Sequence, residues 1–275
     1  MPEPIEPPIG QILKTIEHVL EQGSTATLAT VTIAPRNVGA KIIVPESGPV
    51  VGTFGDVPLD KAVAQRAVEF LAARDEAHLF QVRDFAPELT EWAEASILFE
   101  RLQPEPRVVI CGAGHVGAAL ARLASLTGYH ATLIDDRVDF VVRDLFPDER
   151  IELTAAENWS DAVRDAVGNG RGVSVAIVTR GHNEDEECLR AVITTDADYV
   201  GLIGSKRRTN IVLDRLREAG ADLKKLSKVH APVGLDIGAV TPEEVALAIL
   251  AEMVAEKRGG TGGSLSSWRR DPEKR

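Results

Sequence analysis

A glycine-rich turn near the middle of the chain is its clearest indication of chemistry. The sequence Gly112-Ala113-Gly114-His115-Val116-Gly117 follows the apolar run 107–111 and precedes residues 118–124, which have the composition of a helix. In such a strand–turn–helix unit the first glycine allows the tight turn, the second admits a phosphate close to the backbone, and the third permits close helix–strand packing. The helix start offers free N–H groups and a partial positive charge. The pattern predicts a site for an anionic, nucleotide-like ligand.

An acid follows the next predicted strand. The apolar run 131–134 ends at Asp135 and Asp136. In NAD sites a carboxylate at this position holds the ribose hydroxyls, and Asp135 has the right spacing from the glycines for that role. The alternative is a strand-end acid that accepts hydrogen bonds from neighbouring backbone N–H groups. We expect Asp136 to face solvent. A free carboxylate disfavours a 2′-phosphate, so the pattern favours NAD over NADP.

A basic segment begins another predicted helix. Residues 204–208 place a small polar turn and three cations at the start of a helix expected over 206–219. Cations at a helix N-terminus oppose the helix dipole, which is unfavourable unless an anion offsets them. We therefore expect Ser205, Lys206 and Arg207 to contact a phosphate or carboxylate. The alternative is a solvated helix start whose cations pair with nearby acids.

Three histidines fall where the ligand is expected. His115 lies inside the glycine turn, where it either reaches a bound phosphate or caps the helix. His182 follows the predicted strand 173–178, and His230 opens the glycine-punctuated loop 230–238. An imidazole can transfer protons or bind a ligand, but a single histidine is more often a hydrogen-bonded structural residue. We interpret all three as lining the ligand site, and we assign no catalytic residue and no metal ligand.

The elements that position these residues form two predicted domains. Residues 1–103 make a small α+β domain, and the prolines at 104 and 106 mark its end. From 104 to 258, strands and helices alternate, which is typical of a parallel sheet with helices on both faces. The predicted fold class is α/β, a Rossmann-like parallel-sheet domain preceded by a smaller α+β domain.

In the first domain we expect helices over 9–20 and 57–73 and strands over 25–33, 40–44, 50–54, 78–83 and 97–102. In the second we expect strands over 107–111, 131–134, 173–178 and 199–203 and helices over 160–167, 184–194, 206–219 and from Pro242. Residues 1–8 and 259–275 are expected to be flexible.

Composition narrows the class of protein. The net charge of −11 argues against a general affinity for nucleic acid. The chain has two cysteines, Cys111 and Cys188, far apart in sequence. This excludes a disulfide framework and is typical of a reducing cytoplasm. Cys111 adjoins the glycine turn, so it is either a thiol activated by the helix dipole or, as we favour, a buried strand-end thiol. We expect Cys188 to lie in the core. No apolar run approaches the roughly 20 residues of a membrane helix, so no membrane association is expected.

These segments together resemble the XdhC/CoxI family, the xanthine dehydrogenase accessory factors. The resemblance covers most of the chain and is strongest in its second half. The stretch 230–238 is the most specific because it is long and unusual. The motifs that carry the resemblance are Pro35-Arg36, Gly39-Ala40-Lys41, the turn 112–117, Asp135-Asp136-Arg137, Gly181-His182, Gly201-Leu202-Ile203-Gly204-Ser205-Lys206-Arg207, and His230-Ala231-Pro232-Val233-Gly234-Leu235-Asp236-Ile237-Gly238.

The resemblance implies a function. Members of this family bind the molybdenum cofactor, a phosphorylated pterin that is sometimes extended to a dinucleotide. They are thought to promote or protect its sulfurated form and to pass it to a molybdenum hydroxylase. They act as chaperones more than as catalysts and are often homodimers. The resemblance thus implies molybdopterin, or its dinucleotide, as the ligand and a hydroxylase of the xanthine dehydrogenase type as the client.

One departure from the family pattern keeps other functions open. Where the family has a Gly-Gly-Gly-Cys-Val-Glu stretch, this chain reads Gly52-Thr53-Phe54-Gly55-Asp56-Val57-Pro58-Leu59-Asp60, without the cysteine. A role of that thiol in handling sulfur or molybdenum therefore does not carry over. The alternatives are an NAD-dependent oxidoreductase, with His182 as its proton relay, and a nucleotide-binding scaffold that changes its affinity for a partner.

Overall fold

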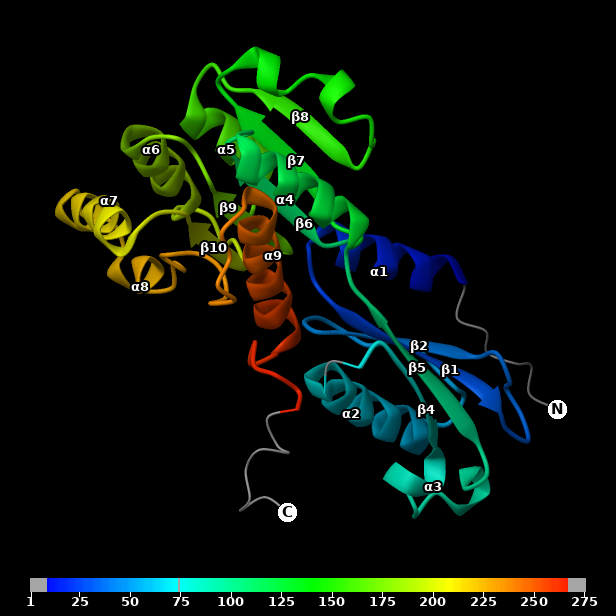
Figure 1. The fold of residues 1–275 in the computed structure, drawn as a ribbon. Coiled ribbons are helices and arrows are strands. Elements are labelled where there is room, and N and C mark those ends of the chain that lie inside the picture. Colours follow the sequence, from blue (N-terminus) through cyan, green and yellow to red (C-terminus); the bar gives the residue numbers. More distant parts are fainter. Residues whose placement is uncertain (1–8, 74, 267–275) are drawn as a thin grey trace, which may run out of the picture. The chain divides into compact units, whose positions relative to one another are not determined.

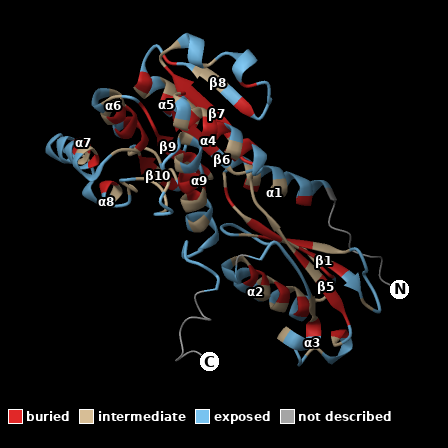
Figure 2. Ribbon diagram, viewed as in Figure 1, coloured by how far each residue is buried: buried red, intermediate tan, exposed pale blue. Residues whose placement is uncertain are grey.

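The computed structural model describes residues 9–73 and 75–266. The expected flexibility of residues 1–8 and 267–275 concerns positions outside these ranges. The chain divides into two compact units, residues 1–104 and 105–275. Each unit has its own hydrophobic core and is described by itself (Figure 2).

The first unit is an antiparallel sheet with helices on both faces. Its strands lie in the order β3-β2-β1-β5-β4. Alternate residues of β2 point to opposite faces, so that Ile42 and Val44 join the core under helix α2, whereas Ile43 packs with Ile12 and Val19 of helix α1. The elements are α1 (Ile9–Glu21), β1 (Ala26–Ile33), β2 (Lys41–Pro45), β3 (Val51–Gly52), α2 (Val57–Ala73), β4 (Ala77–Gln81), α3 (Val82–Phe85) and β5 (Ser96–Leu102).

The second unit is a parallel sheet of five strands in the order β10-β9-β6-β7-β8 (Figure 1). Every strand pair in it is parallel, and the strand-interior residues are mostly buried, as expected of a sheet covered on both faces. The elements are β6 (Arg107–Cys111), α4 (His115–Leu126), β7 (His130–Asp135), β8 (Ile151–Ala155), α5 (Trp159–Val167), β9 (Val173–Ile177), α6 (His182–Val192), β10 (Tyr199–Leu202), α7 (Lys206–Glu218), α8 (Leu223–Leu226) and α9 (Pro242–Arg258).

Two helical layers sandwich this sheet. Helices α4 and α9 pack against each other and cover one face. Helices α5, α6 and α7 cover the other face. The chain runs outward from β6 through β7 to β8 on one side and from β9 to β10 on the other, so the strand order reverses between β6 and β9. In open α/β sheets the ligand crevice lies at such a reversal, beyond the carboxyl ends of the strands.

The predicted fold class is confirmed, with differences in detail. Strand β8 was not predicted, and its parallel pairing with β7 makes it the edge of the sheet. The connection before it contains two short 3₁₀ turns, Val138–Phe140 and Arg143–Leu145, in place of a helix. Helix α9 begins with a capping box between Thr241 and Glu244, because each side chain accepts a hydrogen bond from the other's backbone N–H. Among the described residues no helix is long and apolar enough to cross a membrane.

Candidate functional site

The three glycines of the turn have three different structural roles. Gly112 has a φ of +113°, and a Cβ there would lie 2.7 Å from the Val178 carbonyl oxygen. A Cβ on Gly117 would lie 1.8 Å from the carbonyl oxygen of Gly112, so helix α4 could not pack against its strand. A Cβ on Gly114 would meet no atom within 4 Å. Gly112 and Gly117 therefore have no room for a side chain, whereas Gly114, between them, faces open space.

The amino terminus of α4 is a cradle of backbone donors. Gly114 is its N-cap and supplies no side-chain hydrogen bond, and the first turn contains no acid. The first intrahelical bond runs from the Ala118 N–H to the Gly114 carbonyl, at 2.8 Å. Within the described residues, the N–H groups of His115, Val116 and Gly117 donate to no other group. His115 itself is exposed at the first position of the helix. Free N–H groups at a helix start suit a phosphate.

Asp135 is already saturated with hydrogen bonds. Its side chain is 2% exposed, and its two oxygens accept four bonds: from the Ala113 N–H at 2.7 Å and from the N–H, Nε and Nη2 of Arg137 at 3.0, 2.7 and 2.8 Å. Burial alone would raise the pKa of Asp135, but these bonds outweigh it and hold the pKa below its ordinary value. The structure thus gives this carboxylate the alternative role, that of a strand-end acid bonded to its neighbours. A ribose would have to displace Arg137, so ribose binding stays a prediction.

Asp136, which we expected to face solvent, is instead only partly exposed and is paired with an arginine. Its Oδ1 and Oδ2 accept hydrogen bonds from Nη1 and Nη2 of Arg180, at 2.9 and 2.8 Å. The Arg180 side chain is 49% exposed, and its Nη2 also lies 3.9 Å from Glu184 Oε1. Because Asp136 follows β7 and Arg180 follows β9, this ion pair links two strand ends of the carboxyl edge.

A buried acid joins the starts of α6 and α7. Asp185 is fully buried and accepts a hydrogen bond from the Thr179 hydroxyl at 2.6 Å and another from Arg208 Nε at 3.0 Å. Burial raises the pKa of Asp185, although both bonds oppose the shift. His182 lies at the first position of α6 and is exposed. The network fixes the turns after β9 and β10 relative to each other, and the ligand-lining role of His182 stays a prediction.

At the basic start of α7, some residues fit the interpretation as an anion site and others fit the interpretation as a helix start paired with nearby acids. Ser205 is the N-cap, and its hydroxyl accepts a hydrogen bond from the Arg208 N–H at 3.3 Å. Arg208 pairs with Asp185, as the interpretation without a ligand expected. Lys206 and Arg207 are exposed, and neither pairs with an acid in the described part of the chain. These two cations remain available to an anion, and their role stays a prediction.

His230 belongs to a different cluster. Its backbone extends the sheet beside β10, where its N–H donates to the Val200 carbonyl at 2.9 Å. Its ring stacks on Tyr199, with centroids 4.5 Å apart, and its Nδ1 lies 3.5 Å from Glu252 of α9. Glu252 also accepts hydrogen bonds from the Tyr199 hydroxyl and from the Gly234 N–H. This ring contributes to holding the 230–234 loop on α9, and its ligand-lining role stays a prediction.

Both cysteines are buried, as expected. Neither side chain has measurable exposure. The neighbouring Cys111 side chain, together with burial, raises the pKa of the Cys188 thiol. A buried, protonated thiol is a poor nucleophile and a poor metal ligand. Since these are the only cysteines in the sequence, the chain offers no exposed thiol to sulfur or molybdenum.

In the first unit, the loop 52–60, which differs from the family pattern, is held by hydrogen bonds to two of its own carboxylates. Asp56 accepts hydrogen bonds from the Leu59 N–H and Trp92 Nε1, both at 3.0 Å. Asp60 accepts one from the Phe54 N–H at 2.8 Å and one from the hydroxyl of Thr53 at 2.5 Å. The bond from Leu59 and that from Trp92 hold the pKa of Asp56 below its ordinary value, against the effect of burial. The Asp56 carboxylate thus occupies the amino terminus of α2, and that of Asp60 occupies the preceding turn, which is unfavourable for an anionic ligand.

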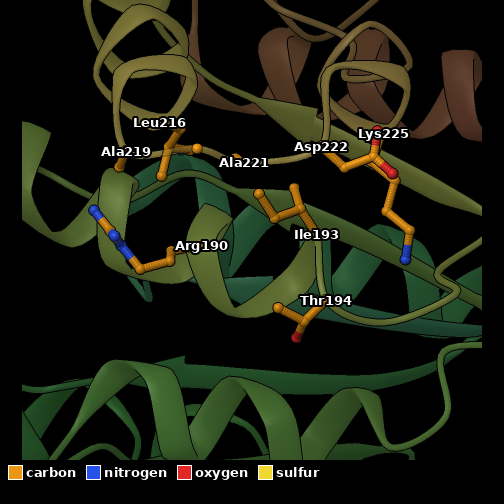
Figure 3. A pocket seen from close by; sticks show the side chains of 9 residues that line it. Arg190, Ile193, Thr194, Leu216, Ala219, Ala221, Asp222 and Lys225 are labelled. Atoms are coloured by element: carbon orange, nitrogen blue, oxygen red, sulfur yellow. The ribbon is translucent and has the colours of Figure 1, made fainter.

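A cavity of about 410 Å³ lies elsewhere in the second unit, where α6 and α7 end and α8 begins (Figure 3). Aliphatic side chains such as Ile193 and Leu216 line it together with Arg190 and Lys225. Both cations already have partners, since Arg190 pairs with Glu186 and Lys225 donates to the Thr195 carbonyl, each at 2.7 Å. The cavity is at the carboxyl ends of α6 and α7, away from the free N–H groups, so it is a weaker candidate than the glycine turn.

Sequence reasoning assigned no role to two arginines of the carboxyl edge. Arg137 covers Asp135 and lies over the ring of Phe140, 3.6 Å from its centroid. Arg180 reaches Asp136 across the edge. The sequence carried a signal for Arg137, an arginine two residues after a strand-end acid. It carried none for Arg180, whose partner is 44 residues away.

Comparison with known proteins agrees with this fold. Residues 108–253 match the XdhC Rossmann domain, and residues 19–83 match the XdhC and CoxI family. The chain is 32% identical to the uncharacterized protein YqeB of Escherichia coli over 83% of its own length and 42% of that protein. It is 28% identical to a probable xanthine dehydrogenase subunit of Bacillus subtilis, over 59% of its length and 46% of that protein. It is 27% identical to the molybdenum cofactor insertion chaperone PaoD of E. coli, over 56% of its length and 41% of that protein.

A solved structure shares the fold. A Bacillus halodurans protein described as a xanthine dehydrogenase superposes with a TM-score of 0.64 and 20% identity, over 95% of this chain and 69% of that one. The chain spans less than half the length of the curated relatives named above. Its Rossmann domain alone accounts for more than half of the sequence. The chain therefore belongs to the XdhC and CoxI family.

Proposed function

We propose that this protein is a cytoplasmic accessory factor that binds the molybdenum cofactor and assists the maturation of a molybdenum hydroxylase of the xanthine dehydrogenase type. The observation that carries the proposal is the open amino terminus of α4, at the strand-order reversal of an XdhC Rossmann domain. The name of the relative PaoD, a molybdenum cofactor insertion chaperone, supports the same role. We expect a homodimer, as the family resemblance implies.

The residues present fit one end of such a cofactor. Its phosphate suits the N–H groups of His115, Val116 and Gly117, beside the open face of Gly114. The exposed Lys206 and Arg207 add positive charge at the same edge of the sheet. For the molybdenum end the chain has no exposed cysteine, and the described residues contain no cluster of metal-ligating side chains. When bound, the cofactor would supply the metal centre for the client's chemistry, and this chain would hold the phosphate.

The saturation of Asp135 weighs against the NAD-dependent oxidoreductase. That enzyme requires a carboxylate free to accept the ribose hydroxyls, whereas both oxygens of Asp135 are engaged by Arg137 and Ala113. A nucleotide-binding scaffold needs neither a free Asp135 nor a redox reaction. We keep it as the second possibility, because the open helix start alone would suffice to bind a nucleotide.

The test is to purify the protein from its native cytoplasm and identify the co-purifying small molecule by mass spectrometry. We expect molybdopterin or its dinucleotide form, and no saturable consumption of NADH followed by its near-ultraviolet absorbance. Recovery of a plain nucleotide without molybdopterin would support the scaffold. NADH turnover with a carbonyl substrate would support the oxidoreductase, and either result would overturn the proposal.

A further inference from the structure

The ion pair between Arg180 and Asp136 crosses the predicted ligand crevice. In the sheet, β6 lies between β9 and β7, so the ends of β9 and β7 are about 10 Å apart, twice the spacing of neighbouring strands. Arg180 follows β9 and Asp136 follows β7, and their side chains meet in a two-fold hydrogen bond at 2.9 and 2.8 Å. The pair therefore spans the carboxyl end of β6, where the glycine turn begins.

This pair differs from two other arginine–acid pairs at the same edge. Arg137 is held on Asp135, whose side chain is 2% exposed, and Arg208 on Asp185, whose side chain is fully buried. Removing either arginine would leave a buried carboxylate without its partner, which is strongly unfavourable. Asp136 is 31% exposed and Arg180 is 49% exposed. Water can solvate either group once they separate, so this pair costs little to open.

We propose that Arg180 is an anion clamp, by which we mean an arginine that is paired with Asp136 in the free protein and pairs with the ligand's phosphate instead when the ligand binds. The inference rests on the function proposed for the α4 site. A guanidinium binds phosphate oxygens through the same paired geometry that it uses for a carboxylate, and a phosphate carries more charge. Asp136 then acts as a competitor that occupies the clamp until an anion arrives.

The proposal predicts opposite effects for the two members of the pair. The probe is inorganic pyrophosphate, titrated by calorimetry into the full chain at fixed ionic strength. Arg180→Gln removes the clamp and is expected to weaken binding about tenfold. Asp136→Asn removes the competitor and is expected to strengthen binding about threefold, because Arg180 is released without losing its charge.

Two matched variants separate the clamp from general changes in charge. Arg190→Gln removes an arginine near the carboxyl end of α6. Its side chain is 50% exposed and is paired with Glu186 of the same helix. Asp214→Asn removes an acid of α7 that is paired with Arg217. We expect pyrophosphate affinity to change less than about twofold in both, as distant surface charges are screened. Thermal unfolding of all four variants checks that each is folded.

The outcomes distinguish this proposal from the proposed function. Equal weakening by Arg180→Gln and Asp136→Asn would mean that the intact pair, not the free arginine, supports the site, and would overturn the clamp. So would unchanged affinity in both, or an effect of Arg190→Gln as large as that of Arg180→Gln. If neither the wild-type chain nor the Asp136→Asn variant bound pyrophosphate at millimolar concentration, the clamp would also be wrong. The proposed function, by contrast, is decided by the identity of the co-purified molecule.

Discussion

Helices α2 and α4 each begin after a turn that contains glycine, but their amino termini are filled differently. At α2, Asp56 accepts the Leu59 N–H, and Asp60 accepts the N–H of Phe54 in the preceding turn. At α4, the N-cap is Gly114, which has no side chain to occupy the N–H groups. A helix start is an anion site only when the chain does not satisfy its donors itself. The comparison therefore favours α4 over α2 as the anion site that we propose.

The same contrast explains the altered loop of the first unit. This chain lacks the family cysteine and has no thiol at this position, and here carboxylates supply local hydrogen bonds instead. The loop is also braced by Asn37, which has a φ of +59° and donates from Nδ2 to the Phe54 carbonyl at 2.7 Å. The loop is thus built for local stability.

The largest expected effect tests the geometry of the α4 turn. Gly117→Ala would place a methyl group 1.8 Å from the Gly112 carbonyl oxygen, which is backbone and cannot move aside easily. We expect a loss of about 3 kcal/mol in the free energy of unfolding, the upper range for overpacking, measured by urea denaturation. Gly10→Ala, in α1, is the control, because a Cβ there meets no atom within 4 Å. Equal stability of the two variants would contradict the close packing of α4 on β6.

The next prediction makes α4 resemble α2. Gly114→Asp adds a carboxylate at an N-cap whose φ of −65° and open surroundings accept a side chain. Aspartate is a favourable N-cap, so the free energy of unfolding is expected to stay the same or rise. Pyrophosphate affinity is expected to fall about 100-fold, since the new carboxylate takes the donors and repels the anion. Retained affinity in calorimetry would remove the α4 start from the ligand site.

The architecture was predictable from the sequence because it follows from local patterns. The glycine turn, the alternating strands and helices, the capping box at Thr241 and the helix 57–73 all depend on residues close together in the chain. Strand β8, Ile-Glu-Leu-Thr-Ala, alternates between apolar and polar residues over only five positions. It was missed because it lies at the edge of the sheet and lacks the continuous apolar run by which the inner strands were predicted.

The fate of most site residues was less predictable, because it depends on partners that are distant in sequence. Nothing near Asp136 indicates that Arg180 will reach it, and nothing near His230 indicates Glu252. Asp135 is different, because its partner Arg137 is only two residues away. That spacing was a local signal, but it did not show how many of the carboxylate oxygens the arginine would engage, so the role of Asp135 was left between two interpretations.

A third prediction concerns the closed start of α2. Asp56→Ala removes the acceptor of the Leu59 N–H and Trp92 Nε1, and is expected to cost about 1.5 kcal/mol in the free energy of unfolding at neutral pH. The pKa of Asp56 is lower in the folded than in the unfolded chain. Its contribution is therefore complete above the ordinary carboxyl pKa and is lost as pH falls through the folded-state value. The difference in stability between wild type and variant should shrink from about pH 5 downward, and a constant difference would contradict the assignment.

The smallest expected effect tests whether the basic start of α7 belongs to the ligand site. Ser205 already caps α7, so Lys206 is free of a structural task. Lys206→Glu replaces attraction by repulsion and is expected to weaken pyrophosphate binding about tenfold, or about 1.4 kcal/mol. The variant should be slightly more stable, since an acid in the first turn complements the helix dipole. Lys224→Glu, on the exposed start of α8, is the control for net charge. If both variants weakened binding equally, the effect of Lys206 would be long-range, and α7 would not form part of the anion site.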